Sequence, residues 1–228
     1  MAFQVLSWND CSVEQWQDVQ EIISTKDITP TDFVLEIGDV FFELDDDLTE
    51  RDLNKLKKAV SFIATPIHAK AKIKVNGREL KNIKRLSLSN YVDLDVLLTN
   101  NNIVDALPEA VKILYDMNDS VYQICVSDVY NSVIDFMEYR KQVGQKYPTI
   151  FDDEEDEYPE GYIPEDDEPQ EQPKSMQEQW LTVVFGMCQG DITKYEQIMS
   201  LPHILVFNWV ALAESLKPRQ PMKTANHH

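Results

Sequence analysis

One segment of this chain cannot contribute to a hydrophobic core, and it divides the rest of the sequence in two. Between Asp152 and Pro173 there are twelve acidic residues and four prolines, but no lysine or arginine. Because like charges repel and proline lacks the amide hydrogen that a helix needs, we expect this segment to be extended and hydrated. The sequence therefore predicts four parts: a body (1–147), an acidic linker (148–174), a C-terminal module (175–217) and a tail (218–228).

Three functions are open for the acidic linker. It can act as a spacer that separates two ordered parts and keeps the protein from aggregating. It can occupy a basic site on a partner until it is displaced, with Tyr158, Tyr162 and Ile163 as apolar points of contact. It can also mimic the backbone of a nucleic acid, although a mimic needs a rigid surface and prolines argue against one.

The overall charge excludes one class of partner and the composition allows a folded protein. The chain has 21 basic and 40 acidic residues, a net charge of −19. Phosphate binding requires a basic surface, so we expect no general affinity for nucleic acid or for an anionic membrane. Hydrophobic residues make up 43% of the sequence, which is enough for a core.

The body reads as a set of helices with recognisable starts. Ser12 and Gln15 form a capping box, Thr29 precedes a proline at a first helical position, and Thr49 lies three residues before Asp52. Apolar residues then recur at helical spacing, which predicts helices near 12–24, 30–44 and 49–63. Later helices are expected after Ser87 or Ser89, around Leu107–Leu114 with Pro108 near the start, and from Val126 to about Lys141.

A β-hairpin is expected near residues 70–85, because alternating apolar residues lead into Asn76-Gly77. The fold class is therefore mainly α with one small β-hairpin (α+β). The hairpin carries the only basic cluster: Lys70, Lys72, Lys74, Arg78, Lys81, Lys84 and Arg85. These residues can protect an exposed strand edge, bind nucleic acid, or receive the acidic linker of the same or another copy. No aromatic residue is interleaved to stack on bases, which favours edge protection.

The C-terminal module is predicted to contain three short helices. They begin at Ser175, at Asp191 and at Pro202. So small a unit normally needs outside help to fold, and it is rich in large aromatic side chains. We therefore predict a partner-binding site formed by Trp180, Phe185, Phe207 and Trp209. The alternative is that these rings pack within the chain.

The sequence contains no pattern typical of an enzyme, and we expect no catalytic, cofactor-binding or metal-binding residues. Phosphate-binding, dinucleotide-binding, zinc-protease and serine-hydrolase motifs are missing. Cys11, Cys125 and Cys188 are widely separated and do not suggest a disulfide framework or a zinc site. No signal peptide and no membrane-spanning run is recognised, so we expect a protein of the cytosol.

The segment Gly190-Asp191-Ile192-Thr193-Lys194-Tyr195-Glu196-Gln197-Ile198-Met199-Ser200-Leu201-Pro202, followed by an amphipathic helix, resembles the closing helices of tail assembly chaperones of tailed bacteriophages. Trp8–Ile23, the turn Val75-Asn76-Gly77 and the segment Leu88–Asp93 are similar in layout to phage morphogenesis proteins. These motifs are short, but the layout covers most of the chain.

The resemblance implies a non-enzymatic assembly factor of the host cytoplasm. Such a chaperone keeps an aggregation-prone structural protein, such as the tape measure, soluble during tail assembly. It implies a body that self-associates and a C-terminal part that binds the client, with no cofactor. The first alternative is a structural virion subunit, such as a ring component near the portal or tail. The second is an acidic inhibitor of a nucleic-acid enzyme.

Overall fold

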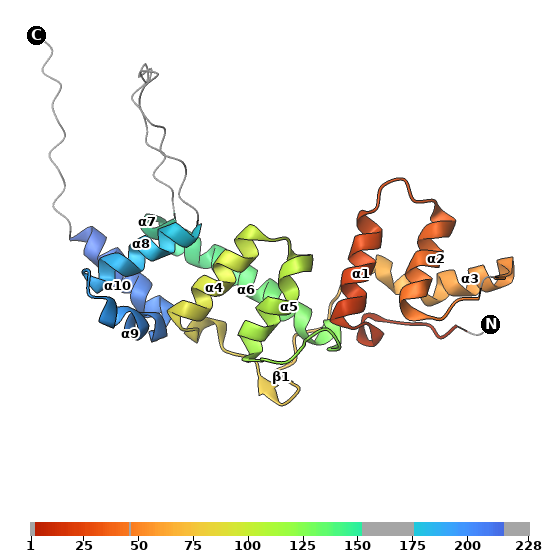
Figure 1. Cartoon of the computed structure of the whole chain (residues 1–228), viewed down its shortest axis with the longest axis horizontal. Helices are drawn as coiled ribbons and strands as arrows, with labels where there is room; N and C mark the ends of the chain where they lie inside the picture. The colour runs from red at the N-terminus through yellow and green to blue at the C-terminus, as the bar shows by residue number, and fades with distance from the viewer. Residues whose placement is uncertain (1–2, 46, 152–175, 217–228) are drawn as a thin grey trace, which may run out of the picture. The chain divides into compact units, whose positions relative to one another are not determined.

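The computed structural model describes residues 3–45, 47–151 and 176–216. This part of the chain is mainly helical with one small antiparallel hairpin, which confirms the predicted fold class (Figure 1). The chain divides into two compact units. Unit 1 comprises Met1–Ile83 and Asp93–Tyr139, and unit 2 comprises Lys84–Val92 and Arg140–His228.

The first three helices of unit 1 begin at the predicted caps. Helix α1 (Val13–Ser24) follows Ser12, whose side chain accepts a hydrogen bond from the Gln15 amide at 3.1 Å while the Gln15 side chain accepts one from the Ser12 amide at 3.1 Å. At the starts of helices α2 (Pro30–Phe41) and α3 (Glu50–Ala59), a threonine hydroxyl accepts a hydrogen bond from the amide three residues later, at 3.2 Å in both cases. Short 3-10 turns, η1 (Trp8–Asp10) and η2 (Ser61–Ala64), flank this group of helices.

A glycine allows α2 to approach α3 closely. In the structure, a Cβ atom at Gly38 would lie 2.7 Å from a methyl carbon of Leu56, which is buried. The missing side chain therefore makes room for Leu56, and the packing compensates for the lower helix propensity of glycine.

The predicted hairpin is present, but its strands are shorter than expected. Strands β1 (Lys74–Val75) and β2 (Arg78–Glu79) pair across Asn76 and Gly77, whose φ angles are 47° and 80°. One further bond links the two sides, from the Leu80 amide to the Ile73 carbonyl at 2.8 Å. Beyond it the Lys72 amide donates to the Asp128 carbonyl at 2.7 Å, and the Lys81 amide donates to the Leu114 carbonyl at 2.8 Å. These bonds to the neighbouring helices end the ladder.

Helix α5 (Ile103–Tyr115) contains a proline within its length, where the sequence suggested a position near the start. Asn102 caps the helix, and Pro108 lies in its second turn. A proline cannot donate the usual hydrogen bond to the carbonyl four residues earlier. The side chain of Gln17 in α1 donates to that carbonyl, of Val104, at 2.7 Å. The interaction therefore supplies the donor that the helix lacks and ties α1 to α5.

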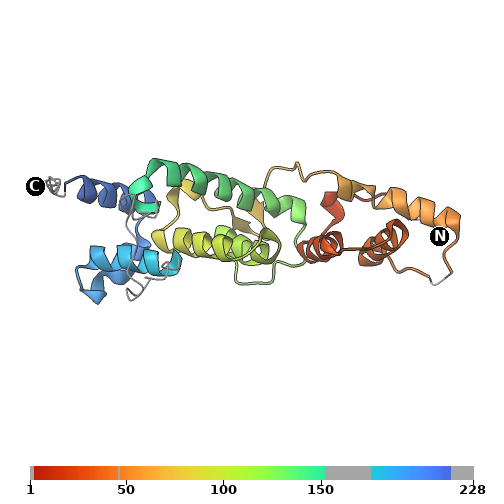
Figure 2. The same cartoon turned by 90° about the horizontal axis from the view of Figure 1, so that it is seen from above.

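Unit 2 takes its helices from two separate stretches of sequence, and its C-terminal helices are drawn in blue in Figure 2. Its elements are the turn η3 (Ile83–Arg85), which it shares with unit 1, the start of α4 (Leu88–Asn100), the end of α6 (Val126–Lys146), α7 (Pro148–Phe151), α8 (Met176–Cys188), η4 (Ile192–Lys194), α9 (Tyr195–Ser200) and α10 (His203–Ser215). The three predicted C-terminal helices are present, the third beginning one residue after Pro202. The predicted cap Ser175 lies outside the described residues.

The predicted domain boundaries differ from the observed units. The sequence assigned residues 84–92 and 140–147 to the body, and the structure groups them with the C-terminal helices. The first residues of the predicted linker form α7, and Phe151 at its end contacts Trp180 of α8, with ring centroids 5.6 Å apart. The described helices on either side of the acidic run, α7 and α8, therefore belong to the same unit. Residues 152–174 of the predicted linker and the predicted tail lie outside the described residues.

We predict that Gln17→Leu lowers the free energy of unfolding of unit 1 by about 1–3 kcal/mol, because the Val104 carbonyl loses its donor. In a Pro108→Ala background the new amide can donate to Val104, so the same change should cost less. Urea denaturation of the four proteins measures this coupling. Gln20→Leu, on the same helix, is the matched control. An equal loss in both backgrounds would contradict the explanation.

Candidate protein-binding site

Unit 2 is built around a cluster of aromatic rings. Trp180 of α8 stacks on Phe207 of α10, with centroids 5.5 Å apart and planes inclined by 23°. Phe151 meets both rings edge-on at 5.6 Å. The remaining rings of the cluster are Tyr91, Tyr147 and His203. Edge-to-face and offset pairs of this kind add to the stability that burial provides.

A short backbone pairing joins the start of α4 to the start of α10. The Leu88 amide donates to the Leu201 carbonyl at 2.7 Å, and the His203 amide donates to the Leu86 carbonyl at 3.1 Å. Nδ1 of His203 also lies 2.9 Å from that carbonyl, so this nitrogen carries the hydrogen and donates. The ring is fully buried and stacks on Tyr91 at 4.6 Å.

The four aromatic residues of the predicted partner-binding site separate into two pairs. Trp180 and Phe207 are 4% and 0% exposed and belong to the core, so the structure assigns them to packing. Phe185 and Trp209 are 69% and 53% exposed. The four residues therefore do not form one surface, and only the second pair is available to a partner.

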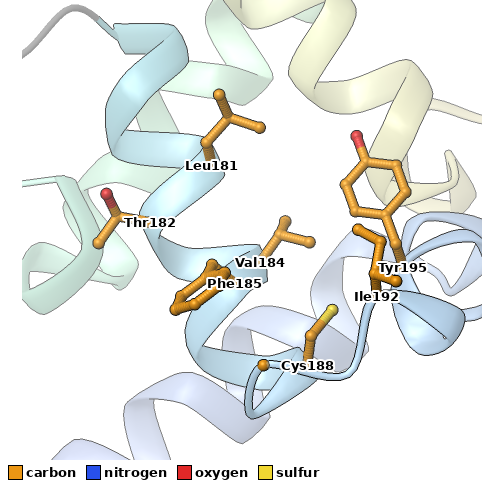
Figure 3. A pocket seen from close by; sticks show the side chains of 8 residues that line it. Leu181, Thr182, Val184, Phe185, Cys188, Ile192 and Tyr195 are labelled. Carbon is orange, nitrogen blue, oxygen red and sulfur yellow. The ribbon is translucent and has the colours of Figure 1, made fainter.

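Phe185 lies in an apolar groove that we call groove A (Figure 3). Leu181, Val184 and Phe185 of α8 line one side, and Ile192 and Tyr195 line the other. The groove has a volume of about 390 Å³ and is completed by Thr182, Cys188 and Gly190. Three of its apolar side chains are solvent-exposed, Leu181 at 51%, Phe185 at 69% and Ile192 at 77%, whereas Val184 and Cys188 are buried.

The turn between α8 and η4 sets the width of groove A. Gln189 and Gly190 both adopt positive φ, at 53° and 79°, and reverse the chain after Cys188. Asp191 then caps the next turn, its carboxylate accepting a hydrogen bond from the Thr193 amide at 3.1 Å. This sequence of turn and cap places Ile192 opposite α8.

A second apolar groove, groove B, contains Trp209. It has a volume of about 460 Å³ and lies between the end of α8, α9 and α10. Its lining residues are Met187, Lys194, Gln197, Ile198, Leu201, Leu205, Val206 and Trp209. Leu205 is 54% exposed and Leu201 is 37% exposed. Both grooves therefore offer open apolar surface of the kind that binds other proteins.

Sequence reasoning missed most of the groove residues. Leu181, Ile192, Tyr195 and Leu201 were not proposed as contact residues. A signal was present, because Leu181 and Phe185 recur at helical spacing beside a second series, Trp180, Val184 and Cys188. Two apolar series on one short helix indicate that packing within the chain uses only one of them.

The predicted basic cluster is partly neutralised in unit 1. Lys72 pairs with Asp128 at 2.8 Å, and Lys81 pairs with Asp116 at 3.0 Å. The hydrogen bond to Asp128 raises the pKa of Lys72, and the hydrogen bond from Lys81 lowers the pKa of Asp116. At least two of its cations therefore hold the hairpin region against neighbouring helices.

The cysteines have structural surroundings. Burial, together with the nearby Cys125 and Asp18, raises the pKa of Cys11 to about 12, so this thiol stays protonated at neutral pH. The Cys125 thiol lies 3.2 Å from the Asn9 carbonyl and 3.1 Å from the Ser127 hydroxyl. Within the described ranges, no group of three or more His, Cys, Asp or Glu residues is placed to hold a metal ion.

In the part of the chain that the structure describes, no helix has the length and apolar character needed to cross a bilayer.

Comparison of the chain with models of protein families, with curated proteins and with solved structures found no match.

We predict that protonation of His203 destabilises unit 2. Burial lowers the pKa of this ring below its usual 6.5, so the unfolded chain binds the proton more tightly than the folded chain. The contribution of neutral His203 to the stability of unit 2 should therefore be fully present above about pH 6.5, and it should be lost as the pH falls below that value. His203→Asn keeps a donor for the Leu86 carbonyl but does not titrate. Chemical denaturation from about pH 7.5 to about pH 5 should show a smaller decrease for the variant, and equal slopes would contradict this role.

Proposed function

We propose that this chain is a non-enzymatic assembly factor that binds an apolar segment of another protein in groove A. The observation that carries the proposal is the exposure of Leu181, Phe185 and Ile192 along one groove. Monomeric proteins rarely leave large apolar side chains together in solvent, and such patches mark protein-binding surfaces. Covering Phe185 alone would contribute about 1–2 kcal/mol to binding.

Helix α8 supports this function because it packs with only one face. Trp180, Val184 and Cys188 are buried, whereas Leu181 and Phe185 are exposed and line the groove. The aromatic core holds α8 through Trp180, so the outer face is already ordered before a partner arrives. A preformed surface binds with a smaller loss of conformational entropy.

The more specific proposal is a tail assembly chaperone of a tailed phage, acting in the host cytoplasm on a client such as the tape measure protein. It rests on the resemblance of residues 190–202. That segment lines both grooves, through Ile192 and Tyr195 in groove A and through Ile198 and Leu201 in groove B. The acidic run would keep a protein with so much exposed apolar surface in solution.

We predict that Phe185→Ser weakens client binding about tenfold or more without unfolding unit 2. The test is co-expression with the tape measure protein encoded by the same genome, measuring its soluble fraction and its co-purification. Ile73→Ser is the matched control, because Ile73 is 79% exposed and lies in unit 1. Undiminished solubility of the client with Phe185→Ser would refute groove A as its binding site.

A structural virion subunit is the second candidate, and the exposed apolar face of α10 favours it. Subunits of a ring bury such faces against their neighbours. Protein composition of purified particles distinguishes the two. A structural subunit is present at an integral copy number, and a chaperone should be missing.

A further inference from the structure

Helix α10 has apolar side chains on two faces, and the core uses only one. His203, Val206 and Phe207 are buried within unit 2. The outer face carries Leu205, Trp209 and Leu212, which are 54%, 53% and 57% exposed, and Leu216, 73% exposed, follows directly after the end of the helix. We call these four residues the α10 seam. Figure 2 shows α10 as the last described helix of the chain.

The spacing of the α10 seam is that of a coiled-coil contact. Successive members are four, three and four residues apart. This alternation places them in one row along the helix, at the positions that interlock with a second helix in coiled coils. The row is about 16 Å long at the usual helical rise.

We propose that the α10 seam pairs with the same seam of a second copy, with the two helices antiparallel. A two-fold axis between Trp209 and Leu212 sets the register. Trp209 of each copy then packs on Leu212 of the other, and Leu205 packs on Leu216 of the other. The contact is isologous and closes at a dimer.

The charge distribution fits a second copy of this chain. A net charge of −19 opposes self-association unless the contact surface itself is neutral. The positions that flank the seam are Val206, Asn208, Ala213 and Ser215, none of which is charged. Pairing two seams therefore brings no like charges into direct contact.

The position of groove B favours an antiparallel arrangement of the two α10 helices. Leu205 and Trp209 line this groove together with Ile198 and Leu201, so the hollow lies beside the first half of the seam. Only an antiparallel pairing places Leu216 of one copy over groove B of the other. The opposed helix dipoles also favour this direction over a parallel one.

The size of the surface makes the dimer weak. A seam of four side chains and one groove is smaller than the roughly 1,200 Å² of a standard stable interface. We therefore expect a dissociation constant on the order of micromolar and a mass that rises with concentration.

The first experiment is sedimentation equilibrium of the full chain over a range of concentrations. The mass should rise from 26.4 kDa toward twice that value. Leu212→Glu should leave the chain monomeric, because each glutamate would be buried without a partner. Phe185→Glu, which adds the same charge in groove A, should still dimerise. Leu216→Glu, directly after the end of α10, replaces Leu212→Glu if circular dichroism shows that the latter does not fold.

The second experiment tests the register. Trp209→Lys and Leu212→Glu should each be monomeric alone, but an equimolar mixture should form a heterodimer, because the antiparallel register pairs the lysine with the glutamate. A parallel pairing would place residue 209 against residue 209 and would give no such rescue.

Three results would overturn the proposal: a wild-type mass that stays at the monomer value at every concentration, a Leu212→Glu variant that still dimerises, or a mixture that stays monomeric. The first would mean that another protein, or another segment of the chain, covers the seam. The proposed client site is tested separately, because Phe185→Glu should lose the client and keep the dimer.

Discussion

The stack of Trp180 on Phe207 is the contact on which unit 2 depends. It joins α8 to α10. Phe151 of α7 contacts both rings, with its centroid 5.6 Å from each of theirs. Each helix is fixed by one aromatic face, so its opposite face is presented outward in a defined orientation. The exposed apolar side chains of groove A and of the α10 seam are therefore a consequence of how the core is made. Removing the stack would remove the geometry of both surfaces together.

Local signals in the sequence were sufficient to predict most of the helix starts. The capping box of Ser12 and Gln15 and the threonine caps before α2 and α3 depend only on residues three positions apart. The turn at Asn76 and Gly77 is equally local, because both residues tolerate positive φ. Such interactions need no knowledge of the tertiary structure, and they were predicted correctly for that reason.

Contacts between distant segments could not be predicted in the same way. Nothing in the spacing around Tyr91 or Tyr147 shows that their rings pack on Phe207, more than 50 residues away. Periodicity also cannot decide which of two apolar faces is buried, so Trp180 and Phe185 looked equivalent. Pro108 within α5 depends on a donor from α1, and only the fold brings Gln17 to it.

The position of the acidic run gives the two apolar surfaces different roles. The twelve carboxylates of the acidic run lie in the sequence between Phe151 and α8, which both belong to unit 2. Two copies that meet through the α10 seam must bring these charges closer, and screening extends over only about 8 Å at physiological ionic strength. Repulsion therefore limits how far copies associate, whereas a client without strong negative charge meets no such barrier at groove A. The same charges that prevent aggregation thus favour a foreign apolar segment over further copies of the chain.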